Sequence, residues 1–196
     1  MRMKYAFLDE AKLSEKEIEE KLLELTNGTM ANIIQVPVHF TTDLITIQPQ
    51  PNGNWIDVMN AEDVSLMTIR PPFGGFKISL GFSMKIPKGY EAHLAPRSST
   101  YQRYGLIQTN GIGIVDESYS GTKDIWMLPV CQLQTPKVNE IPRGTRIAQF
   151  RFIASMEKEM FTAPNPATYY NEPTIAFMIR DTLDGPDRGG FGSTGI

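Results

Sequence analysis

Two segments of this sequence are rich in groups that can bind phosphate. In the first, Arg97 is followed by the hydroxyl residues Ser98 and Ser99, and a guanidinium beside hydroxyls forms a dense cluster of hydrogen-bond donors. The second is the glycine-rich segment 187–196, DRGGFGSTGI, where Arg188 is joined by backbone N–H groups that glycine leaves uncovered. Taken alone, the first segment is equally typical of a polar turn and the second of an unstructured tail.

The segment 109–121, TNGIGIVDESYSG, carries groups that can read a planar base and activate water. Asn110-Gly111 predicts a β-hairpin, whose tip exposes main-chain donors and acceptors. Asp116 directly follows an apolar strand, where its carboxylate could act as a general base. Tyr119 could stack on a sugar or a base. The alternative is a plain hairpin with a solvated acid.

A further polar segment is 142–150, PRGTRIAQF, which is predicted to be a turn that enters a strand. Side chains alternate along a strand, so Thr145 and Gln149 should share one face while Arg146 and Ala148 share the other. An ordinary surface or salt-bridge role for this arginine is the alternative.

Composition excludes several classes of protein. Nineteen basic residues against twenty-two acidic ones give a net charge of -3, whereas a general nucleic-acid binder is more often basic. The single Cys131 excludes an internal disulfide and a thiolate metal cage, and it suggests a reducing compartment. With only two histidines, a multi-histidine metal site is not expected. The longest apolar run, 125–131, is too short to span a membrane, and the N-terminus lacks a signal-peptide core.

One helix is expected, at about residues 14–26. Ser14 and Glu17 form a capping box, an apolar stripe includes Leu22, and Gly28 follows as a stop. A helix this short is marginal alone, so it should pack on the body of the protein.

The rest of the chain reads as short strands separated by glycine and proline, which predicts an all-β, jelly-roll-like distorted barrel. No β–α–β alternation is expected, so a doubly wound nucleotide-binding fold is disfavoured. The expected domain covers residues 1–186, with a helical insertion at about 11–50, and a flexible arm covers 187–196. The expected strands are 4–8, 33–40, 44–48, 64–69, 76–86, 91–95, 113–115, 125–132, 146–153 and 174–179.

Taken in order, these segments resemble the five motifs of the trimeric all-β dUTPases, over about residues 54–195. The stretch GNWIDVMNAEDV at 53–64 resembles the first motif, with Asp57 at its acidic position. The others are matched by PRSS at 96–99, Asn110 through GIVDESYSG at 113–121, RGTRIAQF at 143–150 and RGGFGSTG at 188–195. The third and fifth are the most specific, and the first three look like those of Gram-positive bacteria and their phages.

The resemblance implies hydrolysis of dUTP to dUMP and pyrophosphate, which limits uracil incorporation into DNA and supplies the dTMP precursor. It implies that Asp116 deprotonates water, that Asn110 with the hairpin backbone reads uracil, and that Tyr119 packs on deoxyribose. It also implies Mg2+, with Asp57 holding the metal's water shell. The remaining substrate-binding residues would be Arg97, Ser98, Ser99, Gly113, Arg146, Gln149, Arg188, Gly190, Phe191, Gly192, Ser193 and Thr194.

The resemblance further implies a homotrimer with shared active sites, acting in the cytoplasm of a bacterium or of a phage-infected host, without nucleic-acid or membrane partners. Two alternatives remain open. One is a regulatory protein-binding module that uses the helical insertion. The other is a dCTP deaminase, which needs a glutamate in the strand after the third motif, where this chain reads KDIWML at 123–128.

Overall fold

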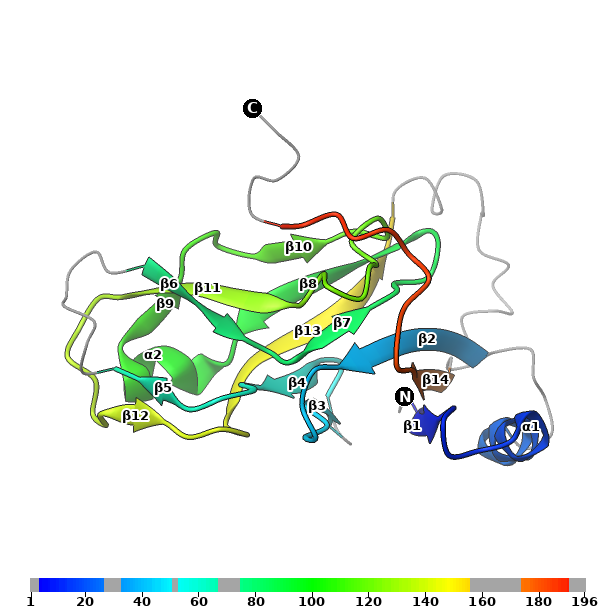
Figure 1. Ribbon diagram of the computed structural model, residues 1–196. Coiled ribbons are helices and arrows are strands. Elements are labelled where there is room, and N and C mark those ends of the chain that lie inside the picture. The colour runs from blue at the N-terminus through cyan, green and yellow to red at the C-terminus, as the bar shows by residue number, and fades with distance from the viewer. Residues whose placement is uncertain (1–3, 27–32, 51–52, 67–74, 156–173, 191–196) are drawn as a thin grey trace.

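The computed structural model describes residues 4–26, 33–50, 53–66, 75–155 and 174–190, and short strands are their main regular structure (Figure 1). The elements are β1 (Lys4–Asp9), α1 (Glu15–Leu25), β2 (Ile33–Phe40), β3 (Ile47–Pro49), β4 (Ile56–Met59), β5 (Val64–Ser65), β6 (Gly75–Ser79), β7 (Phe82–Met84), β8 (Tyr90–Pro96), α2 (Ser98–Tyr104), β9 (Leu106–Gln108), β10 (Gly113–Val115), β11 (Met127–Gln132), β12 (Glu140–Ile141), β13 (Arg146–Ala154) and β14 (Thr174–Ile179). The all-β prediction is confirmed, with two short helices.

The strands form sheets that enclose one main apolar core. A five-stranded antiparallel sheet has the order β10-β8-β13-β4-β3, a three-stranded sheet has the order β6-β11-β9, and β12 pairs with β5. The aromatic rings of Phe82, Trp126 and Phe150 meet at the centre of this core, with the Trp126 centroid 5.0 Å from Phe82 and 5.2 Å from Phe150. These sheets hold the segments that carry the candidate site.

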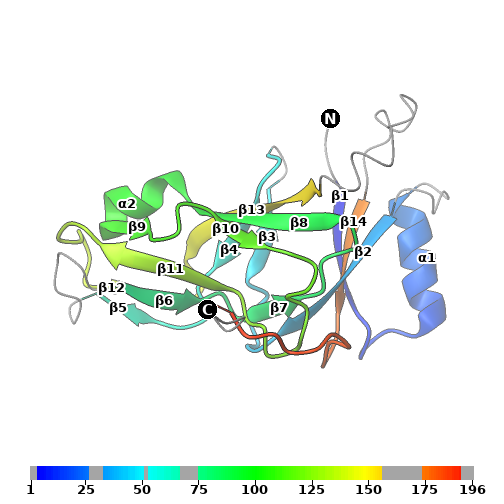
Figure 2. The same cartoon turned by 90° about the horizontal axis from the view of Figure 1, so that it is seen from above.

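The N-terminal segment completes a fourth sheet, which has the order β1-β14-β2-β7. Both β1 and β2 run parallel to β14, and α1 connects them, so this part of the chain is a β–α–β unit with β14 inserted between its strands. The expectation of no such alternation was therefore wrong here. Figure 2 shows α1 covering one side of this sheet, away from the main core.

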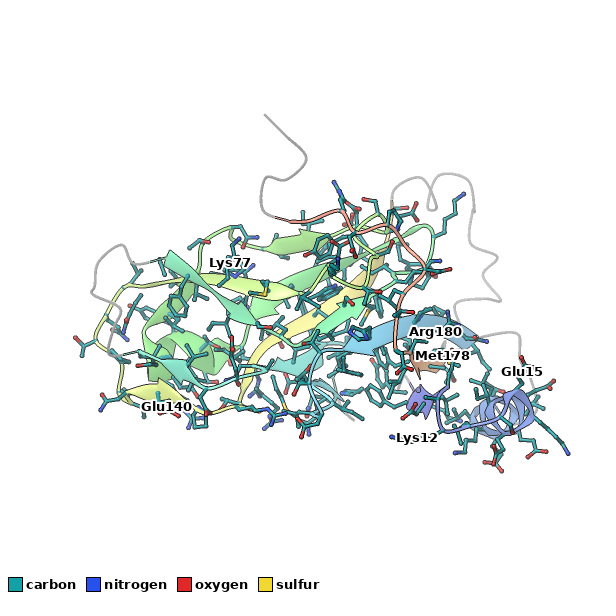
Figure 3. The ribbon with its side chains drawn as sticks, viewed as in Figure 1. Lys12, Glu15, Lys77, Glu140, Met178 and Arg180 are labelled. Atoms are coloured by element: carbon teal, nitrogen blue, oxygen red, sulfur yellow. The ribbon has the colours of Figure 1, made fainter. Side chains whose placement is uncertain are left out.

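The predicted helix is confirmed as α1, and the capping box is present. The Ser14 side chain accepts from the Glu17 backbone N–H, while the Glu17 carboxylate accepts from the Ser14 backbone N–H at 2.8 Å. The apolar side of α1 packs through Leu22 on Leu8 and Met178 of the sheet, and Figure 3 labels Met178 on the sheet beside the helix. The expected stop at Gly28 lies outside the described residues.

Three local predictions about the elements were wrong. The expected strand 76–86 is broken at Gly81, whose φ of 73° favours glycine and whose hypothetical Cβ would lie 2.6 Å from the Ala61 Cβ. The segment that follows Arg97 is a short helix, α2, rather than a turn. The sequence pattern also missed β4, β9 and β12, which are only two to four residues long.

Neither α1 nor α2, the helices of the described residues, combines the length and apolar character needed to span a bilayer.

The packing of α1 predicts a stability effect that is specific to its inner face. Leu22→Ala removes a side chain that is only 2% exposed, and we expect it to lower the free energy of unfolding by about 2–3 kcal/mol. Glu19→Ala, on the exposed face of the same helix, is the control and should stay within about 0.5 kcal/mol. Urea denaturation measures both, and equal effects would contradict the described packing of α1.

Candidate active site

A pocket of about 310 Å³ lies where β8, β10 and β11 meet the C-terminal segment. It gathers six of the residues singled out from the sequence, which come from segments far apart along the chain. They are Asn110, Gly113, Asp116, Tyr119, Arg188 and Gly190. Apolar side chains complete the lining, among them Leu94, Val115 and Trp126. A pocket with apolar walls and a few convergent polar groups is typical of a small-ligand site.

The turn at Asn110-Gly111 lies at one end of this pocket, but it is not the predicted β-hairpin. The strand before it, β9, pairs with β11, and the strand after it, β10, pairs with β8. The turn therefore links two different sheets, because both flanking strands find other partners. Gly111 has a φ of 65°, and the Ile112 N–H donates to the Asn110 carbonyl at 2.7 Å.

Asp116 directly follows β10, as predicted, and its carboxylate faces the C-terminal segment. The Arg188 guanidinium donates from Nη1 to both carboxylate oxygens, at 3.0 and 2.9 Å, and Ser118 donates from its backbone N–H at 2.8 Å. Partial burial raises the pKa of the Asp116 carboxyl, but the hydrogen bonds from Ser118 and Arg188 outweigh burial and bring its pKa below the usual value. Asp116 is therefore ionised at neutral pH, the state in which it can accept a proton.

A buried carboxylate, Asp124, holds the C-terminal segment beside Asp116. Asp124 is 1% exposed and accepts hydrogen bonds from three backbone N–H groups, those of Gly121 at 3.0 Å, Arg188 at 3.0 Å and Gly189 at 2.8 Å. Figure 1 shows this red segment running from the end of β14 toward β10. The backbone of residues 188–189 is thus fixed independently of the Arg188 side chain.

Tyr119 forms another wall of the pocket. Its hydroxyl donates to the Ile125 carbonyl at 3.1 Å, and burial, with a smaller effect of the Asp124 charge, raises its pKa, so the phenol stays neutral. A Cβ on Gly190 would lie 3.2 Å from this hydroxyl. Glycine at this position therefore lets the C-terminal segment lie against the tyrosine ring.

A second polar cluster surrounds Asp57 on β4. Asp57 is 3% exposed, and its carboxylate pairs with Arg97 Nε at 3.2 Å and with Arg146 Nη1 at 3.3 Å. Ser98 and Gln149 line the same hollow. Two guanidinium groups around one buried carboxylate leave a net positive charge, which suits phosphate oxygens.

The predicted alternation of residues 145–149 was wrong because β13 contains a bulge. Its register against β4 shifts between Arg146 and Ala148. Ile147 and Ala148 are consequently both buried, and Arg146 reaches Asp57, which is the strand partner of Gln149. The bulge is what brings this arginine and this glutamine to one cluster.

The two clusters have no lining residue in common. Gln149 pairs with Ala95 and Asp57, so their side chains point to the face of the five-stranded sheet opposite the buried Phe150. Asp116 and Arg188 instead line the first pocket, beside Asn110 and Tyr119. Ser99 is half-buried in α2 and lines neither hollow. The predicted residues Phe191, Gly192, Ser193 and Thr194 lie outside the described part of the chain.

Asp57 is the acidic residue from which a metal ion near the second cluster would be held. Among the described residues, no group of three or more His, Cys, Asp or Glu side chains is arranged to hold a metal ion. Asp57 Oδ2 accepts a hydrogen bond from Arg146 and Oδ1 forms an ion pair with Arg97, yet a carboxylate has about four acceptor positions, so it can still accept from a water molecule. The residues therefore fit an ion that is held by ligand oxygens and water, as Mg2+ prefers.

Reading the sequence missed two residues that shape the pocket. Asp124 directly precedes the predicted strand 125–132 and Trp126 lies near its start, and neither was given a role in the site. A buried aspartate is unusual, but its partners Arg188 and Gly189 are more than 60 residues away, so local pattern could not reveal the contact.

Comparison with known proteins shows the family of this chain. The dUTPase family model matches residues 57–168, more than half of the chain. The SPbeta prophage-derived deoxyuridine 5'-triphosphate nucleotidohydrolase YosS of Bacillus subtilis is 38% identical over 164 residues, which cover 83% of this chain and 99% of that protein. The deoxyuridine 5'-triphosphate nucleotidohydrolase of Zymomonas mobilis is 33% identical and covers 72% of this chain and 81% of that protein.

A solved structure shares the fold. The crystal structure of a dUTPase from Streptococcus mutans superposes with a TM-score of 0.52 at 17% identity, over 61% of this chain and 96% of that one. This likeness shows that the chain has the mostly β fold of a dUTPase. With the family match, this chain belongs to the dUTPase family.

The contacts of Asp124 predict that its charge stabilises the C-terminal segment. Asp124→Asn replaces one acceptor oxygen with an NH2 group that would face backbone N–H donors, and we expect a loss of about 1–3 kcal/mol in the free energy of unfolding. Hydrogen exchange should also show faster exchange at the Arg188 and Gly189 amides. Asp184→Asn, which removes an exposed pair with Lys85, is the control and should cost under about 1 kcal/mol. Unchanged exchange in Asp124→Asn would refute the anchor.

Proposed function

We propose that this chain hydrolyses dUTP to dUMP and pyrophosphate. The observation that carries the proposal is the convergence of Asn110, Asp116, Tyr119 and Arg188 on one pocket that is sized for a nucleoside. Family membership and the names of the relatives support the same reaction.

In the proposed reaction, the ionised Asp116 carboxylate orients a water molecule and takes one of its protons. The resulting hydroxide oxygen bonds to the α-phosphorus, and the anhydride bond from this phosphorus to the oxygen that bridges it to the β-phosphorus breaks. Its bridging electrons leave with pyrophosphate, so that dUTP and water become dUMP and pyrophosphate. Arg188, which pairs with Asp116 without ligand, would turn to the phosphate chain when the triphosphate binds.

Base and sugar selection would come from the same pocket. Apolar walls close to the turn would leave little room for the methyl group of thymine, and Tyr119 would pack on the deoxyribose and disfavour a 2′-hydroxyl. The Asn110 amide and the turn backbone would pair with the polar edge of uracil. A base with the opposite donors and acceptors would leave these groups unpaired.

The phosphate chain would contact the second cluster, with Arg97, Ser98 and Gln149 as ligands and Arg146 adding charge. We propose that this cluster comes from a neighbouring copy in a homotrimer, since one chain holds it apart from the Asp116 pocket. Such head-to-tail contacts close into a ring of three shared sites. Local arginines then offset the charge of the ligand although the chain carries a net charge of -3.

Magnesium would be held by phosphate oxygens and water, with Asp57 accepting from that water shell. When bound, the ion would offset phosphate charge and polarise the phosphoryl oxygens. The C-terminal segment 187–196, of which the structure describes residues 187–190, is proposed to close over the bound triphosphate. The single cysteine supports a reducing compartment, and we propose the cytoplasm.

The role of Asp116 predicts a loss of turnover with retained binding. Asp116→Asn keeps the size of the side chain but cannot accept the proton, so the rate of pyrophosphate release should fall by about 10²–10⁴-fold while the Kd for dUTP changes little. Glu117→Gln, the neighbouring acid whose carboxylate accepts from the Gly89 N–H, is the control and should keep most activity. Near-normal turnover in Asp116→Asn would remove Asp116 from its role.

The shared site predicts that two inactive variants restore each other. Ser98→Glu places a negative charge in the second cluster, at the exposed first residue of α2 where a carboxylate is compatible with the helix. Co-expressed in equal amounts with Asp116→Asn, it should recover about one quarter of the wild-type rate, because a quarter of mixed sites combine two intact clusters. The double variant co-expressed with Asp116→Asn is the control and should recover nothing. Failure of the first mixture to recover activity would contradict sharing.

A further inference from the structure

Gln108, the last residue of β9, is a buried amide beside the pocket that the proposed reaction does not use. Its side chain is only 7% exposed. Its Nε2 donates to the Leu94 carbonyl at 3.3 Å and to Asn110 Oδ1 at 2.7 Å. Gln108 thus connects the backbone of β8 to Asn110, whose amide side chain lines the pocket.

These two contacts fix which way both amides face. A backbone carbonyl only accepts hydrogen bonds, so the end of Gln108 that faces the Leu94 carbonyl must be its NH2 group. The same NH2 group faces Asn110, so the Asn110 atom opposite it must be the oxygen. Turning the Gln108 amide over would place its oxygen against the Leu94 carbonyl oxygen, where two acceptors repel each other.

Gly113 makes room for this arrangement. A Cβ at position 113 would lie 3.3 Å from Gln108 Nε2 and 3.2 Å from the Leu94 Cβ, closer than ordinary van der Waals contact. The Gln108 oxygen, Oε1, is buried and has no hydrogen-bond partner in the described part of the chain. The amide is therefore held by its nitrogen end alone, which is the end that faces Asn110.

The consequence for the pocket is a donor of fixed direction. The Asn110 oxygen is engaged by Gln108, and Asn110 Nδ2 donates no hydrogen bond to another of the described residues, so its amide hydrogens are left for a ligand in the pocket that Asn110 lines. Uracil carries a carbonyl acceptor, O4, where cytosine carries an amino donor. An NH2 group at this place attracts the first and repels the second.

We propose that Gln108 is a positioning residue for base selection: it sets the orientation of the Asn110 amide and so the preference for uracil over cytosine. This inference rests on the proposed function, because it assigns a further residue to the selectivity of that same site. Gln108 acts through Asn110 and does not itself touch the base.

The test compares kcat/KM for dUTP and dCTP, measured as pyrophosphate release. Gln108→Met keeps the length of the side chain but removes its amide, and it should lower the ratio of dUTP to dCTP by about tenfold or more. The loss should appear mainly as a higher KM for dUTP, with kcat nearly unchanged. Gln132→Met is the matched control, since Gln132 is a fully buried glutamine on β11 with both amide atoms unpartnered within the described residues. It should leave the ratio unchanged.

A second pair of variants tests the route through Asn110. In an Asn110→Ala background, Gln108→Met should cause no further change in the ratio, because the amide it orients is already gone. Asn110→Asp changes an exposed position and leaves Gln108 intact. It should remove the preference for dUTP, because it replaces the NH2 group of Asn110 with an oxygen. This variant keeps the proposal testable even where Gln108→Met does not fold.

Three results would overturn the role of Gln108. They are an unchanged ratio in Gln108→Met, an equal loss in Gln132→Met, or a selectivity in Asn110→Asp that matches the unaltered chain. The unaltered chain tests the proposed function separately. Absent pyrophosphate release from dUTP would overturn that function, whereas normal release with unaltered selectivity in the variants would overturn only the role of Gln108.

Discussion

The hydrogen bonds of the buried Asp124 carboxylate organise the candidate site. They tie the backbone of residues 188–189 to the loop that follows Tyr119, and this attachment holds the Arg188 guanidinium on Asp116. The two segments approach so closely that a Cβ on Gly121 would lie 2.5 Å from the Asp187 Cα. An ionised group buried in this way is stable only with such partners, so the anchor and the pocket depend on each other.

At three places in the site, a polar side chain is held in one orientation by the groups around it. Asp116 is kept ionised by Ser118 and Arg188, and Asp57 gathers two arginines into one cluster. Asn110 is oriented through Gln108. Apart from Arg188, which is proposed to turn to the phosphate chain, these groups are in place before a ligand binds, and preorganisation of this kind is a large part of electrostatic catalysis.

Much of this could be predicted from the sequence, because the signals are local. The capping box of Ser14 and Glu17 predicted α1, and the order of the polar segments predicted the family. The misses have non-local causes. Asn110-Gly111 forms no hairpin because its flanking strands pair elsewhere, and the bulge in β13 appears only in its register against β4. The positions of Asp124 and Gln108 in the site depend on hydrogen bonds to Gly189 and Leu94, which are distant in sequence, so no local pattern predicts them.

Pyrophosphate and ammonia release, measured with Mg2+ on the purified full chain, tests the central claim most directly. The four substrates are dUTP, dCTP, dTTP and UTP, supplied separately. The account predicts pyrophosphate from dUTP, little or none from the other three, and no ammonia from any. Ammonia from dCTP, or equal pyrophosphate release from all four nucleotides, would contradict it.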